Sequence, residues 1–260
     1  MRAPPRIKGN LPTRLAWLLA GLLLFATGIV ALLESRLGLS PWDVLHQGIA
    51  RQTPLSFGEA NIAVSVAVLL TAWLLGARVG LGTLANALLV GGFVQLLTSL
   101  SAVTHLAHEP LALRIGMLAA GLALMGSGTG LYLGAGLGAG PRDSLMVVGA
   151  TRTRFRIGLV RATLELSALA AGAALGGTVG IGTLAFALGI GPLAELAFWL
   201  LERSPLTTKG PRDEPDPVRT ERLDLGGAGH GPGGDGDSSR KARLRLRLLL
   251  GPPLRKQPDP

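Results

Sequence analysis

The chain repeats itself: residues 14–97 align without a gap on residues 114–197 when the sequence is shifted by 100 positions. About a third of the aligned positions are identical, and many identities are glycines or prolines, which constrain the backbone most strongly. The densest match pairs VGLGTLA at 79–85 with VGIGTLA at 179–185. The fold must therefore accommodate two copies of one structural unit.

Each copy contains three apolar stretches close to the ~20 residues that a helix needs to cross a bilayer. The stretches cover residues 15–33, 57–75 and 79–100, and then 115–137, 157–176 and 179–201. Only 16% of the chain is charged, against about 25% in soluble domains, and 48% is hydrophobic. We therefore predict an all-α polytopic membrane protein with six transmembrane helices.

A shorter segment follows the first span of each copy and begins with a Pro-x-Asp motif. The two segments are SPWDVLH at 40–46 and GPRDSLM at 140–146. Pro41 and Pro141 suit the first position of a helix, and Asp43 and Asp143 suit the third, near the positive helix terminus. We predict a short half-helix in each copy, either re-entrant or lying at the membrane interface.

Three spans per copy is an odd number, so the two copies should have opposite orientations in the membrane. The loop charges support this, because positive residues gather on the cytoplasmic side. The second copy carries Arg142, Arg152, Arg154 and Arg156 after its first span, whereas the matching loop of the first copy is nearly neutral. We predict two inverted three-helix repeats with both termini cytoplasmic, an architecture of many secondary transporters.

These features divide the chain into five parts. They are a cytoplasmic N-terminus (1–13), a first membrane repeat (14–100), an outer loop (101–113), a second membrane repeat (114–201) and a tail (202–260). The tail is rich in Pro, Gly, Asp and Arg, so we expect it to be disordered, basic and cytoplasmic. Residues 241–250 are basic and amphipathic, and they are either solvated or in contact with anionic lipid.

The two Pro-x-Asp motifs are the first candidate site. If both half-helices face one cavity, their N–H groups would attract an anion, and Asp43 and Asp143 a proton or cation. Alternatively, the two carboxylates only cap the helix starts. Trp42 and Arg142 occupy the same repeat position, so the two ends must differ chemically, and Arg142 either sets topology or contacts a substrate.

Glu165 and Arg161 form a second candidate, because ionisable residues deep in a membrane span are costly and often functional. The alternative is an i,i+4 ion pair without a further role. Their counterparts in the first copy, Asn61 and Ser65, are polar, so this helix face is hydrophilic in both copies.

The Gly-x-Gly-Thr motifs are assigned to structure. They comprise Gly80, Gly82 and Thr83 in the first copy, and Gly180, Gly182 and Thr183 in the second. No strand precedes either motif, which argues against a nucleotide-binding loop. We predict that they permit close helix packing and a tight turn into the following helix.

Several function classes are disfavoured. The chain has no cysteine, which excludes disulfides and thiolate metal sites. No catalytic triad, paired carboxylates or phosphate-binding loop can be assembled, so we expect no enzyme activity, cofactor or metal. The formal charge of +9 is explained by topology rather than nucleic-acid binding, since the sequence has a single Tyr and no basic surface with interleaved aromatic residues.

Three motifs in order resemble the YczE-like membrane proteins, within the broader YitT-like group. They are LGLSPWDVLHQG at 37–48, GAGPRDSLM at 138–146 and GIGTL at 180–184. The resemblance covers residues 14–200 and leaves out the tail. It implies an integral protein of the bacterial cytoplasmic membrane, and it implies no substrate and no catalytic residues.

Two functions of different class remain open. The first is a secondary transporter or channel for a small solute or ion, and the second is a membrane accessory or regulatory protein that transports nothing. The expected partners are the lipid bilayer and, for the first function, the solute; the sequence leaves the oligomeric state open.

Overall fold

The computed structural model describes residues 5–101, 106 and 109–207, and these residues form a helical bundle. Most of the predicted tail, including residues 241–250, lies outside the described residues. The helices are α1 (Leu11–Ser35), α2 (Pro41–Gln52), α3 (Phe57–Leu74), α4 (Leu81–Thr98), α6 (Leu111–Gly134), α7 (Pro141–Thr153), α8 (Ile157–Ala174) and α9 (Ile181–Arg203).

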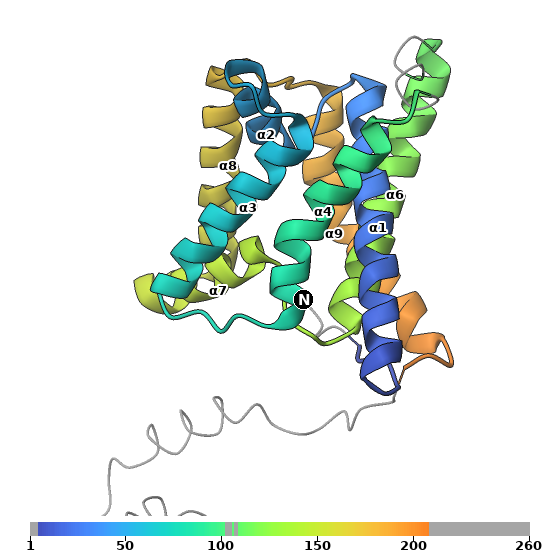
Figure 1. The fold of residues 1–260 in the computed structure, drawn as a ribbon, viewed down its shortest axis with the longest axis vertical. Helices are drawn as coiled ribbons and strands as arrows, with labels where there is room; N and C mark the ends of the chain where they lie inside the picture. Colours follow the sequence, from blue (N-terminus) through green and yellow to red (C-terminus); the bar gives the residue numbers. More distant parts are fainter. Residues whose placement is uncertain (1–4, 102–105, 107–108, 208–260) are drawn as a thin grey trace, which may run out of the picture. The chain divides into compact units, whose positions relative to one another are not determined.

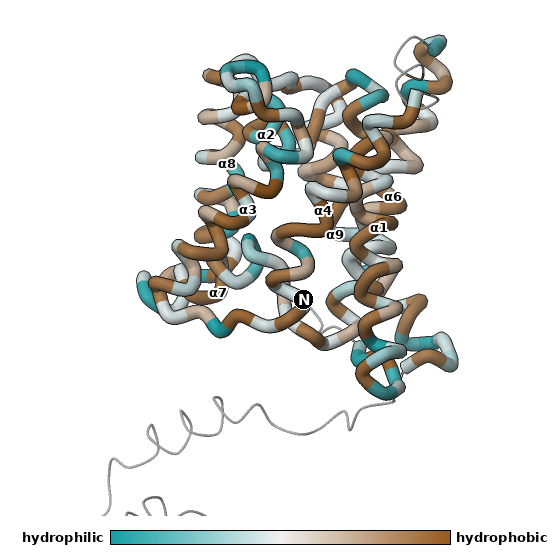
Figure 2. The backbone as a smooth tube through the Cα atoms, viewed as in Figure 1, coloured by the Kyte–Doolittle hydropathy of each residue, from teal (hydrophilic) through white to brown (hydrophobic). Residues whose placement is uncertain are grey.

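Six of these helices are long and apolar enough to cross a membrane, namely α1, α3, α4, α6, α8 and α9. This confirms the all-α fold with six spans. The two short helices, α2 and α7, start at the Pro-x-Asp motifs and lie at opposite ends of the long helices (Figure 1). Apolar residues predominate along the long helices, and polar residues are concentrated toward their ends and in the short helices (Figure 2).

The helix starts follow from local sequence. Pro41 and Pro141 each occupy the beginning of their helix, where a missing N–H costs nothing. The Ser40 hydroxyl accepts a hydrogen bond from the backbone N–H of Asp43 at 3.3 Å and caps α2. The Ser56 and Glu59 side chains form a reciprocal capping box at the start of α3.

Helices α1 and α6 pack closely because glycines face one another along their contact. A Cβ on Gly28 would lie 2.6 Å from the carbonyl oxygen of Gly121, and one on Gly128 would lie 2.7 Å from that of Gly21. Gly21 and Gly28 are the repeat equivalents of Gly121 and Gly128, so the two copies contribute matching positions to one antiparallel interface. Small residues permit this approach of two backbones.

The loops of each copy hold the other copy by the same pair of contacts. The N–H of Gly82 donates to the carbonyl of Leu137 at 2.9 Å, and the N–H of Gly182 donates to that of Leu37 at 2.7 Å. The hydroxyls of Thr83 and Thr183 each accept a bond at 3.2 Å from the glycine three residues earlier. The Gly-x-Gly-Thr motifs therefore join the two copies as well as turning the chain into a helix.

Arginine side chains make a further matched pair of contacts. Arg14 donates to the carbonyl of Ala135 at 2.8 Å, and Arg114 donates to the carbonyl of Ser35 at 2.7 Å. These carbonyls end α6 and α1, where helix C-termini carry partial negative charge. Arg14 and Arg114 therefore each hold the end of a helix in the other copy.

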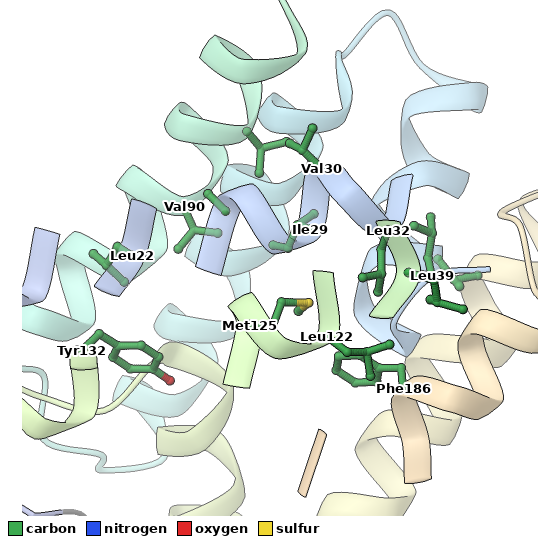
Figure 3. Close-up of a cluster of buried hydrophobic side chains, with 14 of the residues drawn as sticks. Leu22, Ile29, Val30, Leu32, Leu39, Val90, Leu122, Met125, Tyr132 and Phe186 are labelled. Atoms are coloured by element: carbon green, nitrogen blue, oxygen red, sulfur yellow. The ribbon is translucent and has the colours of Figure 1, made fainter. Parts of the chain in front are cut away.

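The apolar core lies between the two copies. It is formed by buried side chains of α1, α4, α6 and α9, among them Leu22, Ile29, Val90, Met125 and Phe186 (Figure 3). Ile29 and Met125 are fully buried, at 0% exposure. The core therefore fixes the two copies against each other, while the outward leucines of the long helices remain exposed, as a lipid solvent requires.

Described structure continues past the predicted end of the second repeat at residue 201. Helix α9 runs to Arg203, and Thr207 forms an isolated antiparallel bridge with Ile7. Ile7 and Thr207 are both buried, so the segment just after α9 packs against the segment before α1.

A Gly180→Val substitution tests the loop contact between the copies. A Cβ at Gly180 would clash with the carbonyl oxygen of Leu37, so we expect a loss of about 1–3 kcal/mol in the free energy of unfolding. Thermal unfolding in detergent measures the effect. Gly116→Val is the control, because a Cβ there meets nothing within 4 Å; equal stability of both variants would contradict the proposed contact.

Candidate functional site

A cavity of about 450 Å³ lies between the two copies, within the size range of small-molecule sites. It receives side chains from both short helices and from long helices of both copies. Of the residues that the sequence nominated, Trp42, Asn61, Pro141, Arg142, Asp143, Arg161 and Glu165 line it. Residues far apart in the sequence therefore meet at one site.

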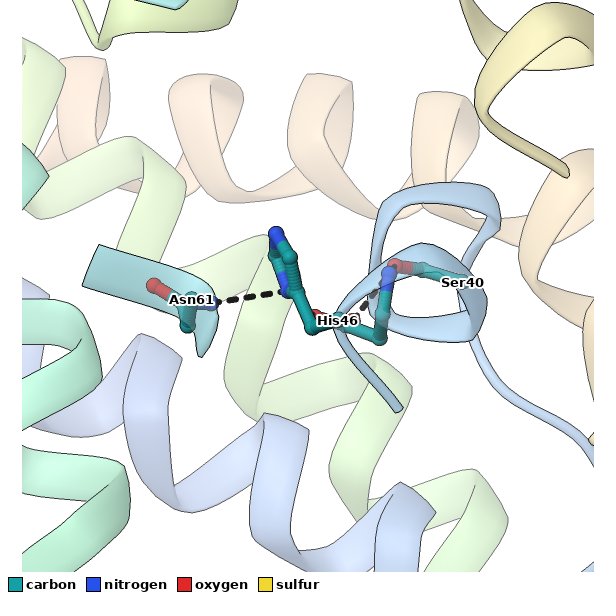
Figure 4. A network of polar contacts seen from close by, with 4 residues as sticks. Ser40, His46 and Asn61 are labelled. Atoms are coloured by element: carbon teal, nitrogen blue, oxygen red, sulfur yellow. Dashed lines mark hydrogen bonds and ion pairs between the residues drawn. The ribbon is translucent and has the colours of Figure 1, made fainter. Parts of the chain in front are cut away.

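Asp43 does not line the cavity, which differs from the sequence hypothesis that both motif carboxylates face it. Its side chain is fully buried, with 0% exposure. It accepts a hydrogen bond from the Ser40 hydroxyl, and its Oδ1 lies 3.2 Å from His46 Nδ1, which in turn lies 3.1 Å from Asn61 Nδ2. Figure 4 shows this chain of polar contacts between α2 and α3. The network satisfies the carboxylate internally and leaves it no open face.

The neighbours of Asp43 shift its pKa downward in spite of its burial. Burial alone would raise the pKa of Asp43, but the hydrogen bond and charge of His46, followed by Arg142 and Ser40, together lower it below its ordinary value. Asp43 is therefore a carboxylate that the protein itself satisfies behind the cavity wall.

Asp143 has different neighbours although it occupies the same repeat position. Gly140 replaces the capping Ser40, and Met146 replaces His46, so neither contact exists. Instead, the hydroxyl of Tyr132 donates to Asp143 Oδ2 at 3.1 Å. Burial raises the pKa of Asp143 above its ordinary value, because the bond from Tyr132 and the charge of Arg142 offset only part of that effect. Asp143 is thus the more readily protonated of the two carboxylates.

Trp42 and Arg142 meet although they occupy equivalent positions in different copies. The guanidinium carbon of Arg142 lies 5.0 Å from the centre of the Trp42 ring, within the range of a cation–π contact. Two equivalent positions that touch must lie where the two copies face each other. The difference in side chain therefore gives the centre of the cavity one charged and one aromatic wall.

Arg161 and Glu165 form an ion pair on α8, with 2.9 Å between Nε and Oε1. Their side chains are 35% and 29% exposed, so the pair faces open space in the cavity. Such partly exposed i,i+4 pairs contribute little to stability. The predicted i,i+4 ion pair is therefore present, and it supplies polar groups to the cavity wall.

The cavity is open because one helix pair is packed in the first copy and separated in the second. Helices α3 and α4 pack along each other, whereas α8 and α9 scarcely touch. A Cβ on Gly91 would lie 2.6 Å from the carbonyl oxygen of Gly58, so these glycines form the α3–α4 contact. Their repeat equivalents, Gly158 and Gly191, meet nothing within 4 Å.

Helix α8 packs on α2 near its C-terminal end and touches α7 near its N-terminal end. At the C-terminal end, Gly172 lies directly against the backbone of Leu45, and Gln52 donates to the carbonyl of Leu175 at 3.1 Å. Arg51 donates to the carbonyl of Gly176. The N-terminal half of α8, which carries Arg161 and Glu165, borders the cavity instead of packing on α9.

The cavity is also lined by Tyr132, Asn86 and Phe186, which were not predicted from the sequence. A signal for Tyr132 was available: it is the chain's single tyrosine, and its repeat equivalent is Leu32. A polar group that appears in only one copy of a membrane repeat indicates a local requirement. Within residues 5–101, 106 and 109–207, no group of His, Asp and Glu side chains converges to hold a metal ion.

The fold and the cavity define a polytopic helical membrane protein with a polar site between two repeats. The chain belongs to the family described as a family of unknown function (DUF6198), whose sequence model matches residues 12–198. It is 40% identical over 191 residues to an uncharacterized protein of Haemophilus influenzae, covering 71% of this chain and 85% of that protein.

A second relative is the uncharacterized membrane protein YczE of Bacillus subtilis, which is 34% identical over 188 residues, covering 70% of this chain and 84% of that protein. The resemblance to YczE-like proteins is thereby confirmed, and with it the assignment to multi-pass membrane proteins. No solved structure matches the chain.

Matched cysteines test the difference between the two copies. Ala194 lines the cavity, whereas its repeat equivalent Val94 is fully buried. The wild-type protein has no cysteine, so it serves directly as the background. We expect a membrane-impermeant thiol reagent to modify Ala194→Cys at least ten times faster than Val94→Cys in purified protein. Similar rates would show that the two helix pairs are equally open.

Proposed function

We propose that this protein is a secondary transporter that exposes the central cavity to the two sides of the membrane in turn. The observation that carries this proposal is the unequal state of one repeated helix pair, closed at α3–α4 and open at α8–α9 around a shared cavity. The proposed activity moves a solute without covalent chemistry, so no residue is assigned a catalytic role.

The repeat suggests the second conformation. In transporters built from inverted repeats, the two copies exchange conformations, so that the closed pair opens and the open pair closes. Applied here, the N-terminal half of α8 would swing onto α9 about its anchor at Gly172. Gly158 and Gly191 would then meet as Gly58 and Gly91 do in this structure.

The energetics of glycine favour this interpretation. A glycine inside a helix costs roughly 0.5–1 kcal/mol relative to alanine, which is offset only where close packing needs it. Gly58 and Gly91 have that packing. Gly158 and Gly191 lack it in this conformation, although most other positions of the two copies have diverged. A state in which α8 closes on α9 would explain why both positions are glycine.

The proposed location is the bacterial cytoplasmic membrane with both termini in the cytoplasm, in keeping with the two bacterial relatives. The arginine-rich end of α7 then faces inward, and the cavity is open toward the cytoplasm. Reporter fusions after residues 105 and 155 should give an outside and an inside signal, respectively. The same side for both would rule out opposite orientations of the repeats.

A Gly191→Leu variant tests transport through its gate. Solute uptake into vesicles containing the purified protein is screened first, and the variant is then tested with the transported solute. Gly191 has open space around it in this structure but precedes Pro192, so we expect the variant to fold with some loss of thermal stability, which thermal unfolding measures separately from uptake. Its side chain blocks closure of α8 on α9, so uptake should fall at least ten-fold.

Gly92→Leu is the matched control, because Gly92 also meets nothing within 4 Å but adjoins the closed pair. It should keep near wild-type uptake. Equal uptake by both variants would refute the gate. A complete absence of solute uptake by the wild type would favour the alternative, a membrane accessory protein in which the repeat is a scaffold.

A further inference from the structure

We propose that Arg142 binds the charged group of an organic anion, whose apolar body occupies the remainder of the cavity. This assignment names the substrate class of the proposed transporter and in that respect rests on the proposed function. The binding step itself can be measured without transport.

The first observation is that Arg142 lacks a direct polar partner. Among the described residues, no hydrogen bond or salt bridge joins its guanidinium to a protein group; its neighbour is the face of Trp42 at 5.0 Å. Four other charged groups at or beside the cavity behave differently. Asp43, Asp143, Arg161 and Glu165 each have a hydrogen-bond partner in the protein.

Leaving the N–H donors of Arg142 without a protein acceptor costs free energy. An arginine side chain remains protonated, carries five N–H donors and is expensive to place within a membrane protein unless those donors are satisfied. Asp43 and Asp143 attract Arg142 through space, which compensates part of its charge. They do not use its N–H groups. Arg142 is partly exposed, so an acceptor that enters the cavity can reach these groups.

The geometry suits a carboxylate. The guanidinium carbon of Arg142 lies over the Trp42 ring at 5.0 Å, and its N–H groups bond to no protein group among the described residues. A planar guanidinium binds carboxylate with two parallel hydrogen bonds, which gives orientation as well as affinity. Arg142 also stands in the first turn of α7, where the helix dipole favours a negative ligand.

The rest of the cavity wall suits an apolar body. Phe25, Leu164, Phe186, Ile190 and Phe198 line it. A cation is the less suitable ligand, because Asp143 and Glu165 are already bonded within the protein. Glu195 also lines the cavity, but its side chain is exposed and water can solvate it.

Benzoate is the probe. Benzylamine and benzyl alcohol share its aromatic ring but not its negative charge, and chloride shares the charge but has no apolar body. Each is titrated into purified full-length protein in detergent at constant ionic strength, and binding is followed by calorimetry and thermal unfolding. We expect benzoate to bind and to raise the unfolding temperature of the wild type. Benzylamine, benzyl alcohol and chloride should have much smaller effects.

Arg142→Gln removes the charge, and Arg142→Lys keeps the charge but loses the planar fork. We expect benzoate affinity to fall at least ten-fold in Arg142→Gln and by a smaller factor in Arg142→Lys. Arg154→Gln is the control, because Arg154 is exposed at the end of the same helix and should leave benzoate affinity unchanged.

The proposal is overturned if the wild type does not bind benzoate, if benzylamine, benzyl alcohol or chloride binds as well, or if Arg142→Gln keeps wild-type affinity. Failure of the transport proposal gives a different result. Benzoate binding that depends on Arg142, with no uptake of any solute in vesicles, would retain the anion site and reject transport.

Discussion

The structure depends on backbone contacts that each copy of the repeat makes to the other. Gly82 donates to the carbonyl of Leu137 while Gly182 donates to that of Leu37, and facing glycines bring α1 and α6 together. In lipid, helices gain no hydrophobic driving force from meeting each other, so close packing and hydrogen bonds must hold the bundle. These paired contacts fix α1, α6 and the starts of α4 and α9, and they leave α3 and α8 as the helices that can differ between the copies.

That freedom gives one repeated unit two environments. In the first copy, α3 closes on α4 and the Asp43 carboxylate is sealed by Ser40 and His46. In the second copy, α8 stands apart from α9, and Asp143 faces the cavity beside Tyr132. The same motif therefore builds a sealed carboxylate at one end and a carboxylate on the cavity wall at the other. The proposed transport cycle uses this difference, since it requires each end to open while the other is closed.

The sequence predicted the elements better than their arrangement. Apolar stretches of about 20 residues identified all six spans, because that length is fixed by the bilayer. The burial of Asp43 was not predictable from its motif, since it depends on the packing of α2 against other helices, as in the contact of His46 with Asn61 of α3. Nor could the pattern show that Gly58 is packed while Gly158 is open, because the same residue type occupies both positions. Whether a helix pair is packed or separated depends on the whole bundle. The repeat in the sequence is compatible with either arrangement.

The most direct test of alternating gates is the distance across each helix pair, measured by double electron–electron resonance in lipid vesicles. Spin labels on cysteines at 163 and 196 report on α8–α9, and labels at the equivalent positions 63 and 96 report on α3–α4; all four positions are exposed. Alternating gates should give two distances for each pair in the wild type. Introducing Gly191→Leu should leave only the long distance across α8–α9 and only the short one across α3–α4. One unchanged distance per pair in both proteins would contradict alternating gates.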